Sequence, residues 1–250
     1  MSDSPLFTII TVTFNAESTI SPTLKSIENQ TFTDFQYLVV DGLSQDATLD
    51  VVKKAGIKNA DIICEKDSGL YDAMNKGLHY AKGQYLIFLN AGDSFHAPDT
   101  LQKIASTIKQ NGYPDITYGQ TIIVNSEREK IANRHLTAPR NLTFDSFKNG
   151  MLVCHQAFIA KRSITEDYNL KYRYSADYEW CIRCLKKSQK NVYIDDILID
   201  YLNEGVTTAN FKKSLKERYK IMCKYYGTLS TLLRHIKFLF RHLIRKIHSQ

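Results

Sequence analysis

The segment YLIFLNAGDSF, residues 85–95, is the stretch that most strongly constrains the fold. Residues 86–89 are apolar without alternation, which is typical of a strand that is buried on both faces. The apolar run stops there, and Asn90, Gly92 and Asp93 follow at once. An apolar strand followed directly by a carboxylate predicts a central strand of the sheet. Its carboxyl end is then expected to carry a functional residue.

The segments around this strand alternate between strand and helix patterns. Strands are predicted at residues 6–14, 35–41, 61–65, 84–90 and 115–124. Helices are predicted at residues 17–30, 46–56, 69–83 and 98–112, with stop signals at Gly56, Gly83 and Gly112. This order predicts βαβ units and a mostly parallel sheet flanked by helices. Ligands of such sheets bind at the carboxyl ends of the strands, so we expect one crevice lined by Asn15, Asp41, Glu65, Asn90 and Asp93.

The second half of the chain is less regular. We expect a mobile polar loop at residues 125–150, strand material at 150–161, a helix at 175–187 and a further strand at 192–202. The predicted organisation is one α/β domain over residues 1–205, divided near residue 124, followed by an amphipathic helical extension over residues 206–250.

Composition is that of an ordinary globular protein. The chain has 250 residues, of which 43% are hydrophobic, enough for one large domain with or without an appendage. We expect no membrane-spanning helix and no signal peptide, because no apolar run is long enough and no basic region opens the chain. The five cysteines are odd in number, which favours a reduced, cytoplasmic protein. Cys181 and Cys184 lie one turn apart in a helical pattern, and we assign them to the core.

The positive charge of the chain is concentrated at its C-terminus. Residues 211–250 hold eleven Lys and Arg and one Glu, a net charge of +10 within a total of +7, so residues 1–210 carry −3. Residues 231–250 have the pattern of a basic amphipathic helix, which predicts contact with a membrane surface through residues 229–250. The alternative is a terminal helix docked on the domain. A nucleic-acid-binding function is disfavoured by the acidic body and the absence of a nucleic-acid-binding motif.

The common phosphate-binding loops are missing. The first strand is followed by NAESTI rather than G-x-G-x-x-G, and no G-x-x-x-x-G-K-[ST] occurs. The glycine-rich, basic loop expected of a sugar nucleotidyltransferase is absent as well. The carboxylates of Asp41 and Asp93 therefore remain the candidates for chemistry, either as acceptors for a base or ribose or as ligands of a divalent cation. Considered alone, Asp41 and Asp93 also fit a purely structural role, as residues that stabilise a turn or cap a helix.

Four motifs together resemble family 2 glycosyltransferases with the Rossmann-like GT-A fold, the group that includes enzymes of capsule and O-antigen lipopolysaccharide synthesis. The motifs are TIITVTFNAESTI, FQYLVVDGLSQDAT, EKDSGLYDAMNKGLHYAKGQYLIFLNAGD and SADYEW, in this order, and the resemblance covers about residues 6–200. It implies an inverting transfer from a nucleotide-sugar, with a donor-binding half at about residues 1–124 and an acceptor and catalytic half at about residues 125–205.

The resemblance also assigns site residues. It implies donor or nucleotide contacts by Thr13, Asn15, Glu17, Asp41, Asp72, Asn75 and Lys76, with Asp41 on the nucleoside. Asp177 matches the catalytic base. Residues 90–93 match the family's D-x-D-D stretch, but they read Asn-Ala-Gly-Asp, so Asp93 is the one carboxylate left to hold Mn²⁺ or Mg²⁺. Such a cation would stabilise the leaving diphosphate, and a base would take the proton of the acceptor hydroxyl.

Other residues have a weaker assignment. Asn90 and His155 are possible active-site residues, although a His in an apolar setting is more often a core residue. Tyr71, Tyr172 and Tyr174 are able to stack on a sugar or to pack in the core. The predicted function is transfer of a hexose from a UDP-sugar to a lipid-linked saccharide, by a peripheral enzyme on the cytoplasmic, inner face of the plasma membrane. The alternative is a non-catalytic nucleotide-sugar-binding subunit.

Overall fold

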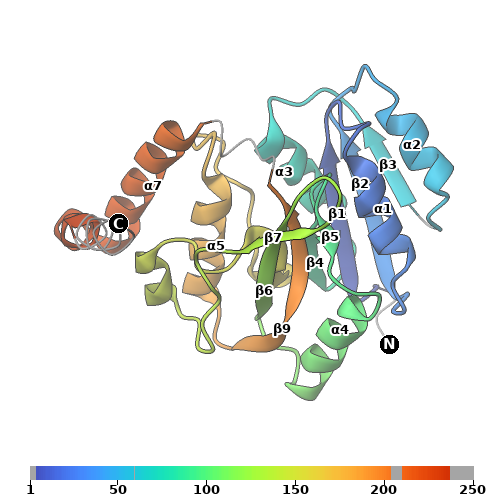
Figure 1. Ribbon diagram of the computed structural model, residues 1–250. Coiled ribbons are helices and arrows are strands. Elements are labelled where there is room, and N and C mark those ends of the chain that lie inside the picture. The colour runs from blue at the N-terminus through green and yellow to red at the C-terminus, as the bar shows by residue number, and fades with distance from the viewer. Residues whose placement is uncertain (1–3, 59, 204–209, 237–250) are drawn as a thin grey trace.

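A computed structural model describes residues 4–58, 60–203 and 210–236. The first half contains four parallel strands and the helices between them (Figure 1). The strands are β1 (Phe7–Thr13), β2 (Phe35–Asp41), β3 (Ala60–Cys64) and β4 (Tyr85–Phe88). The helices are α1 (Ile20–Glu28), α2 (Thr48–Ala55) and α3 (Leu70–Tyr80). Every strand predicted here is present, and each ends within two residues of its predicted end.

The second half completes the sheet and adds the outer helices. Its strands are β5 (Ser94–Phe95), β6 (Ile116–Val124), β7 (Lys130–Asn133), β8 (Phe158–Lys161) and β9 (Asn191–Leu202). Its α-helices are α4 (Thr100–Gln110), α5 (Ala176–Lys187) and α7 (Phe211–Tyr226). Three short 3₁₀ turns lie at Phe144–Asn149, His155–Ala157 and Arg162–Ile164.

The strands form one mixed sheet in the order β3-β2-β1-β4-β8-β6-β9-β5, and β7 pairs with β6. Pairing is parallel from β3 to β4 and between β6 and β9. β8 runs antiparallel to both of its neighbours, β4 and β6. In the parallel register Thr13 lies opposite Asp41, and Asp41 lies opposite Cys64. The ends of β1, β2 and β3 therefore meet at one edge of the sheet, as βαβ topology requires.

The core follows the apolar pattern of the central strands. Every residue of β1 and β4 is buried, whereas β3 is partly exposed because it lies at the edge of the sheet. A second cluster, of aromatic rings, packs Phe88, His155, Tyr168 and Trp180 between β4 and α5. Both halves of the chain thus share one continuous core.

Three local predictions were wrong. α3 ends at Tyr80, not at Gly83. A Cβ at Gly83 would lie 2.4 Å from the backbone of β1, so this glycine permits close packing of two chain segments. The mobile polar loop expected over residues 125–150 instead contains β7 and a 3₁₀ turn with a buried Phe147. The strand expected over 150–161 is reduced to β8.

The C-terminal part of the chain packs on the domain. Ile221 and Met222 of α7 are buried, and the Glu217 carboxylate accepts backbone hydrogen bonds from Arg173 (2.9 Å) and Tyr174 (2.8 Å). α7 thereby holds the segment that leads into α5. Cys181 and Cys184 of α5 are buried, which confirms their assignment to the core.

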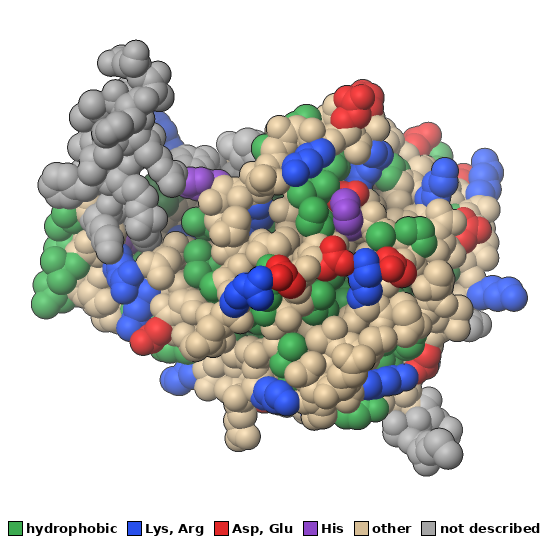
Figure 2. Space-filling model, turned by 60° about the horizontal axis from the view of Figure 1, so that its bottom comes forward, with side chains coloured by type: hydrophobic (Ala, Val, Ile, Leu, Met, Phe, Trp, Pro, Cys, Tyr) green, Lys and Arg blue, Asp and Glu red, His purple; other side chains and the backbone are tan. Residues whose placement is uncertain are grey.

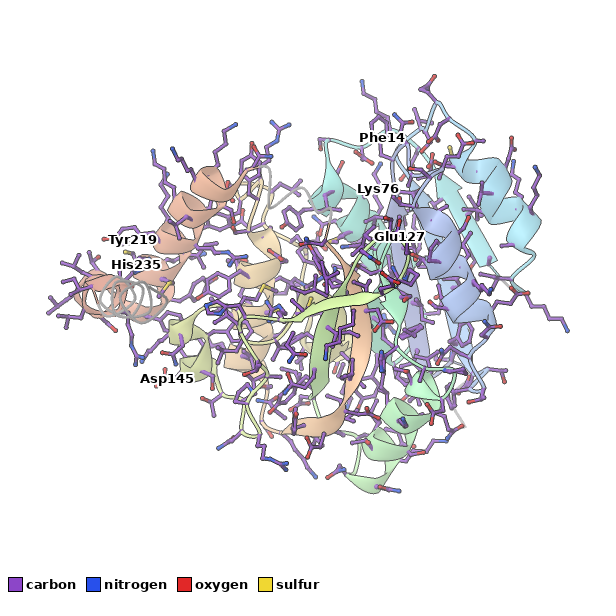
Figure 3. All side chains as sticks on the ribbon, in the orientation of Figure 1. Phe14, Lys76, Glu127, Asp145, Tyr219 and His235 are labelled. Atoms are coloured by element: carbon purple, nitrogen blue, oxygen red, sulfur yellow. The ribbon has the colours of Figure 1, made fainter. Side chains whose placement is uncertain are left out.

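Residues 228–236 form a further helical segment next to α7. His235 packs its ring against Tyr219 of α7, with ring centroids 5.1 Å apart (Figure 3). Most of the predicted basic amphipathic helix, residues 237–250, lies outside the described residues. Within the described part of the chain, no helix combines the length and apolar character needed to cross a membrane. Acidic and basic side chains are interspersed over the face of the body shown in Figure 2.

Candidate active site

A cavity of about 1030 Å³ opens at the carboxyl ends of β1 and β2. Its walls come from the tips of these two strands, from the loop that enters α3, and from the segment before α5. The residues that line it are Val12, Thr13, Phe14, Gly42, Leu43, Lys66, Asp67, Ser68, Gly69, Leu70, Tyr71, Asp72, Leu170, Tyr172, Arg173, Tyr174 and Asn210. A cavity is therefore present at the predicted edge of the sheet, but none of the five residues expected to line the crevice, Asn15, Asp41, Glu65, Asn90 and Asp93, is part of its wall.

Beneath the cavity, Asp41 is fully buried and bonded to neighbouring side chains and backbone. Its Oδ2 accepts hydrogen bonds from the hydroxyls of Thr13 (2.9 Å) and Ser44 (2.5 Å). Its Oδ1 accepts from the backbone N–H of Ser44 (2.8 Å) and contacts the Cys64 thiol at 3.5 Å. A carboxylate offers about four acceptor positions. Asp41 thus uses its acceptors to fix the strand tips and lies behind the cavity wall.

Asn15 and Glu17 connect two loops outside the cavity wall. The Asn15 side chain accepts a hydrogen bond from the Gln45 backbone (2.8 Å), and the Glu17 carboxylate accepts one from the Ala47 backbone (3.1 Å). The Asn15 backbone N–H donates to the Ser44 hydroxyl (2.9 Å). These contacts hold the loop after β1 against the loop after β2, and so they shape the cavity from behind.

The entrance to α3 supplies the second wall. Asp72 lines the cavity, and its Oδ2 accepts two hydrogen bonds from Ser68, from the N–H and from the hydroxyl, both at 2.9 Å. The bond from the Ser68 backbone is the main reason that the pKa of Asp72 lies below its usual range. Together these contacts fix the turn that precedes the helix.

Asn75, Lys76 and Glu65 support this wall without lining the cavity. Asn75 exchanges hydrogen bonds with the backbone of Tyr168, at 3.1 and 2.6 Å. The Lys76 ammonium, on α3 in Figure 3, pairs with Glu65 at 3.3 Å and donates to the Lys66 carbonyl. Glu65, which was expected to line the crevice, is therefore an exposed partner of Lys76.

A third carboxylate, Asp67, lies in the cavity wall and was missed by sequence reasoning. Its Oδ1 accepts a hydrogen bond from the Gly69 backbone at 2.9 Å. A Cβ built on Gly42 would lie only 2.3 Å from Asp67 Oδ2. The available signal was the position of Asp67 directly after the third predicted strand, in the sequence Asp-Ser-Gly.

Asp177 lies in the first turn of α5 and does not itself line the cavity. Its Oδ1 accepts a hydrogen bond from the Tyr71 hydroxyl at 3.0 Å, and Tyr71 lines the cavity. Burial, followed by the negative charge of Asp177, raises the pKa of Tyr71 well above its usual value, so the phenol stays protonated and donates. Tyr172 and Tyr174 also line the cavity, and Tyr172 packs against the core as well.

Asp93 lies away from the cavity wall and is only 4% exposed. Its Oδ1 accepts from the Leu202 backbone (2.9 Å), and its Oδ2 accepts from the Gln156 amide (2.7 Å). Burial raises the pKa of Asp93 to about 7 against the opposing effect of these bonds. The neighbouring Gly92 carbonyl accepts a hydrogen bond from Arg128 at 2.7 Å. The structure thus gives Asp93 the contacts of a carboxyl that joins the 90–93 loop to β9.

These residues do not fit a divalent cation that bridges to a diphosphate. A cation of this kind is held by carboxylates together with substrate phosphates, whereas Asp93 is buried and lies outside the cavity wall. Asn90 Oδ1 is buried and lacks a hydrogen-bond partner among the described residues, but Asn90 is not part of the cavity wall. No group of three or more His, Cys, Asp or Glu suited to a metal occurs within residues 4–58, 60–203 and 210–236.

His155 belongs to the aromatic cluster of the core. Its Nε2 lies 2.7 Å from the Tyr168 hydroxyl, and its ring packs against Phe88 and Trp180. Burial lowers the pKa of His155 to about 4, so the imidazole is neutral at physiological pH. This environment matches the packing alternative for His155 rather than contact with a ligand in the cavity.

The chain is similar to known glycosyltransferases. The model of the Glycosyl transferase family 2 matches residues 8–168. A PGL/p-HBAD biosynthesis glycosyltransferase from Mycobacterium bovis is 35% identical over 187 residues, 72% of this chain and 70% of the relative. The Escherichia coli UDP-Glc:alpha-D-GlcNAc-diphosphoundecaprenol beta-1,3-glucosyltransferase WfaP is 23% identical over 246 residues, 92% of this chain and 95% of WfaP.

The fold is similar to that of S. aureus TarS in its complex with UDP-GlcNAc. The TM-score is 0.71 at 18% sequence identity, and the match covers 93% of this chain and 73% of the TarS chain. This likeness confirms the predicted GT-A fold class.

Proposed function

The chain belongs to glycosyl transferase family 2, and we propose that it transfers a hexose from a UDP-sugar, with inversion, to a lipid-linked saccharide acceptor. The names of the relatives support this substrate class. WfaP is named for a UDP-Glc donor and a diphosphoundecaprenol-linked acceptor, and TarS was solved with UDP-GlcNAc. The product would be an intermediate of a bacterial surface polysaccharide such as an O-antigen or capsule.

The observation that carries the proposal is the hydrogen bond between Asp177 and Tyr71, a residue that lines the cavity. The cavity is large enough for a nucleotide-sugar, which needs a few hundred Å³ or more. Asp177 accepts a hydrogen bond from Tyr71 of the cavity wall and is half-buried rather than enclosed in the core. A carboxylate in this position has the reach of a general base for a hydroxyl that enters beside the donor.

The reaction is a single displacement at the anomeric carbon. The acceptor oxygen forms the new glycosidic bond on one face of the sugar while the bond to the diphosphate breaks on the other. The hydroxyl proton passes to Asp177, and UDP departs with the electron pair of the broken bond. Lys66 and Arg173 line the cavity and provide positive charge near the leaving diphosphate. No step is assigned to a metal ion.

The C-terminal segment 229–250 would hold the enzyme at the inner face of the membrane, where a lipid-linked acceptor is found. Leu229, Leu232 and Leu233 are exposed in the part that the structure describes, with Leu233 60% exposed. Basic residues in the same segment would attract anionic lipid by roughly 1 kcal/mol each. Co-sedimentation with anionic and neutral vesicles tests this. The Leu232→Asp/Leu233→Asp variant should lose binding, and binding equal to wild type would contradict membrane attachment through this segment.

A donor screen tests the transferase assignment. The full chain is incubated with UDP-, GDP- and dTDP-sugars, and nucleotide release is measured with and without a lipid-linked saccharide. We expect turnover with a UDP-hexose that is stimulated by the acceptor. Binding of a UDP-sugar without any turnover would instead support the non-catalytic binding subunit, and no binding of any nucleotide-sugar would contradict both.

A further inference from the structure

A carboxylate oxygen of Asp67 fills the space beside Gly42 at the tip of β2. Any side chain at position 42 would begin 2.3 Å from Asp67 Oδ2 and 3.1 Å from Asp67 Cγ. A Cβ at this distance would force the Asp67 side chain to move, so the glycine at 42 leaves the carboxylate room in its present position. Both residues line the cavity. The wall at the tip of β2 thus presents a carboxylate that comes from a different loop.

One oxygen of Asp67 is available for a ligand. Oδ1 is fixed by the Gly69 backbone N–H at 2.9 Å, which orients the carboxylate. Oδ2 has no hydrogen-bond donor among the residues that the structure describes. Asp41 is the contrasting case, because both of its oxygens accept from Thr13 and Ser44 behind the wall. A ligand would have to displace one of those hydrogen bonds to reach Asp41. A ligand that bonds to Asp67 Oδ2 displaces none.

The surroundings of Asp67 Oδ2 suit a flat heterocycle. The ring of Phe14 comes within 3.4 Å of the same Cβ position on Gly42. Phe14 is 62% exposed although it lines the cavity, and Leu43 beside Gly42 is exposed as well. Phe14 lies at the end of β1 near the top of the sheet (Figure 3). An aromatic face next to a carboxylate acceptor matches a base that stacks on the ring and donates an N–H at its edge.

We propose that Asp67, rather than Asp41, is the carboxylate that reads the nucleobase of the donor. Asp67 Oδ2 accepts the hydrogen bond of the uracil N3–H, and Gly42 provides the room for this contact. The assignment rests on the proposed UDP-sugar donor. It makes Asp67 a specificity-determining residue, because a carboxylate accepts hydrogen bonds and gives none when ionised.

The test compares UDP with N3-methyl-UDP, which lacks the N3–H donor. Calorimetry on the full chain should show that wild type binds UDP about 10- to 100-fold more tightly than the methylated analogue. In Asp67→Ala, UDP affinity should fall by that factor while the affinity for N3-methyl-UDP stays the same. Asp50→Ala is the matched control, because Asp50 is an exposed acidic residue on α2 away from the cavity. It should behave like wild type.

The outcomes separate this proposal from the proposed function. If wild type binds UDP and Asp67→Ala retains the full preference for UDP over N3-methyl-UDP, then the Asp67 assignment is overturned and the UDP donor stands. If wild type does not bind UDP, then the proposed donor is overturned together with Asp67. An equal loss of affinity for both nucleotides in Asp67→Ala would show a merely structural role and would also overturn the assignment.

Moving the carboxylate from position 67 to position 42 gives a second test. Gly42→Asp alone should force the Asp67 carboxylate out of its present position. In the Gly42→Asp/Asp67→Ala double variant the collision is removed, and the new carboxylate is carried by a Cβ that lies 2.3 Å from the former position of Asp67 Oδ2. UDP affinity should recover to within a few-fold of wild type. A folded double variant with no recovery would argue against a carboxylate at this point as the base-reading group.

Discussion

The Tyr71 hydroxyl donates a hydrogen bond of 3.0 Å to Oδ1 of Asp177, across 106 residues of sequence. This bond joins the wall of the cavity on α3 to the first turn of α5. It orients the carboxylate that we propose as the general base. The ring of Tyr71 is itself held by stacking on Tyr168, with centroids 5.6 Å apart.

Removing this bond should reduce catalysis without removing the base. Tyr71→Phe keeps the ring and its stacking but leaves Asp177 without its donor. We expect turnover to fall by about tenfold, which corresponds to roughly 1.4 kcal/mol, while UDP affinity stays within twofold. Steady-state kinetics with calorimetry measures both. Tyr80→Phe, at an exposed position on the same helix, is the control. Turnover that equals wild type would show that orientation by Tyr71 is irrelevant to the reaction.

Asp41 should act mainly through stability. Asp41→Ala leaves the Thr13 hydroxyl and the Ser44 N–H without their acceptor at a buried position. Each unsatisfied group costs about 1–3 kcal/mol. We expect a melting temperature several degrees lower, with UDP binding weakened equally for UDP and N3-methyl-UDP. If the variant has normal stability and loses affinity for UDP but not for N3-methyl-UDP, then Asp41 rather than Asp67 contacts the nucleoside.

Asp93 should behave as a structural residue. Asp93→Ala removes the acceptor for the Leu202 N–H and the Gln156 amide, so unfolding should occur at a clearly lower urea concentration. Whatever effect Mn²⁺ or a chelator has on wild-type turnover should be the same in the variant. Normal stability combined with a lost response to Mn²⁺ would instead identify Asp93 as the metal ligand expected from the D-x-D-D comparison.

His155 should make the folded state sensitive to acid. Its pKa is about 4 in the folded chain and about 6.5 when unfolded, so between these values the unfolded chain binds more protons. The contribution of His155 to the free energy of unfolding is therefore fully present above pH 6.5. It falls by up to about 3 kcal/mol as the pH is lowered toward 4. Urea unfolding across this pH range should show that His155→Gln loses less of its free energy of unfolding on acidification than wild type does. Parallel pH profiles would contradict the assignment of a buried neutral imidazole.

The sequence patterns predicted the parts of the fold that local chemistry determines. Apolar runs followed by polar tips located β1, β2 and β4, and parallel pairing placed their ends at one edge. The contacts of Asp93 were not predictable in this way. Its partner Leu202 lies 109 residues away, on a strand whose pairing is set by tertiary packing. The two-residue strand β5 is too short to carry a pattern of its own.

The same limit applied to the site residues. Of the residues assigned to the donor or to catalysis, Thr13 and Asp72 line the cavity, and Asp177 is bonded to Tyr71 of its wall. Asp67 and Phe14 were missed because they lie on loops, where side-chain direction depends on contacts that periodicity does not encode. The local signs were the position of Asp67 just after the third predicted strand and the glycine at position 42, which leaves the tip of β2 without a side chain.

The central claim is that Asp177 takes the proton of the acceptor hydroxyl. Asp177→Asn keeps an oxygen that accepts the Tyr71 hydrogen bond, but the amide does not accept a proton at neutral pH. The substitution removes one negative charge from the first turn of α5. This should lower the free energy of unfolding by about 0.3–1 kcal/mol. Asp50→Asn makes the same change in the first turn of α2, away from the cavity, and is the matched control.

The direct measurement is single-turnover transfer from the UDP-sugar to the acceptor, with melting temperature and UDP affinity recorded for the same samples. The account predicts that Asp177→Asn melts within a few degrees of wild type, binds UDP normally and transfers at least about 100-fold more slowly. Asp50→Asn should transfer at the wild-type rate. Transfer by Asp177→Asn within a few-fold of wild type would contradict the account and place the base elsewhere.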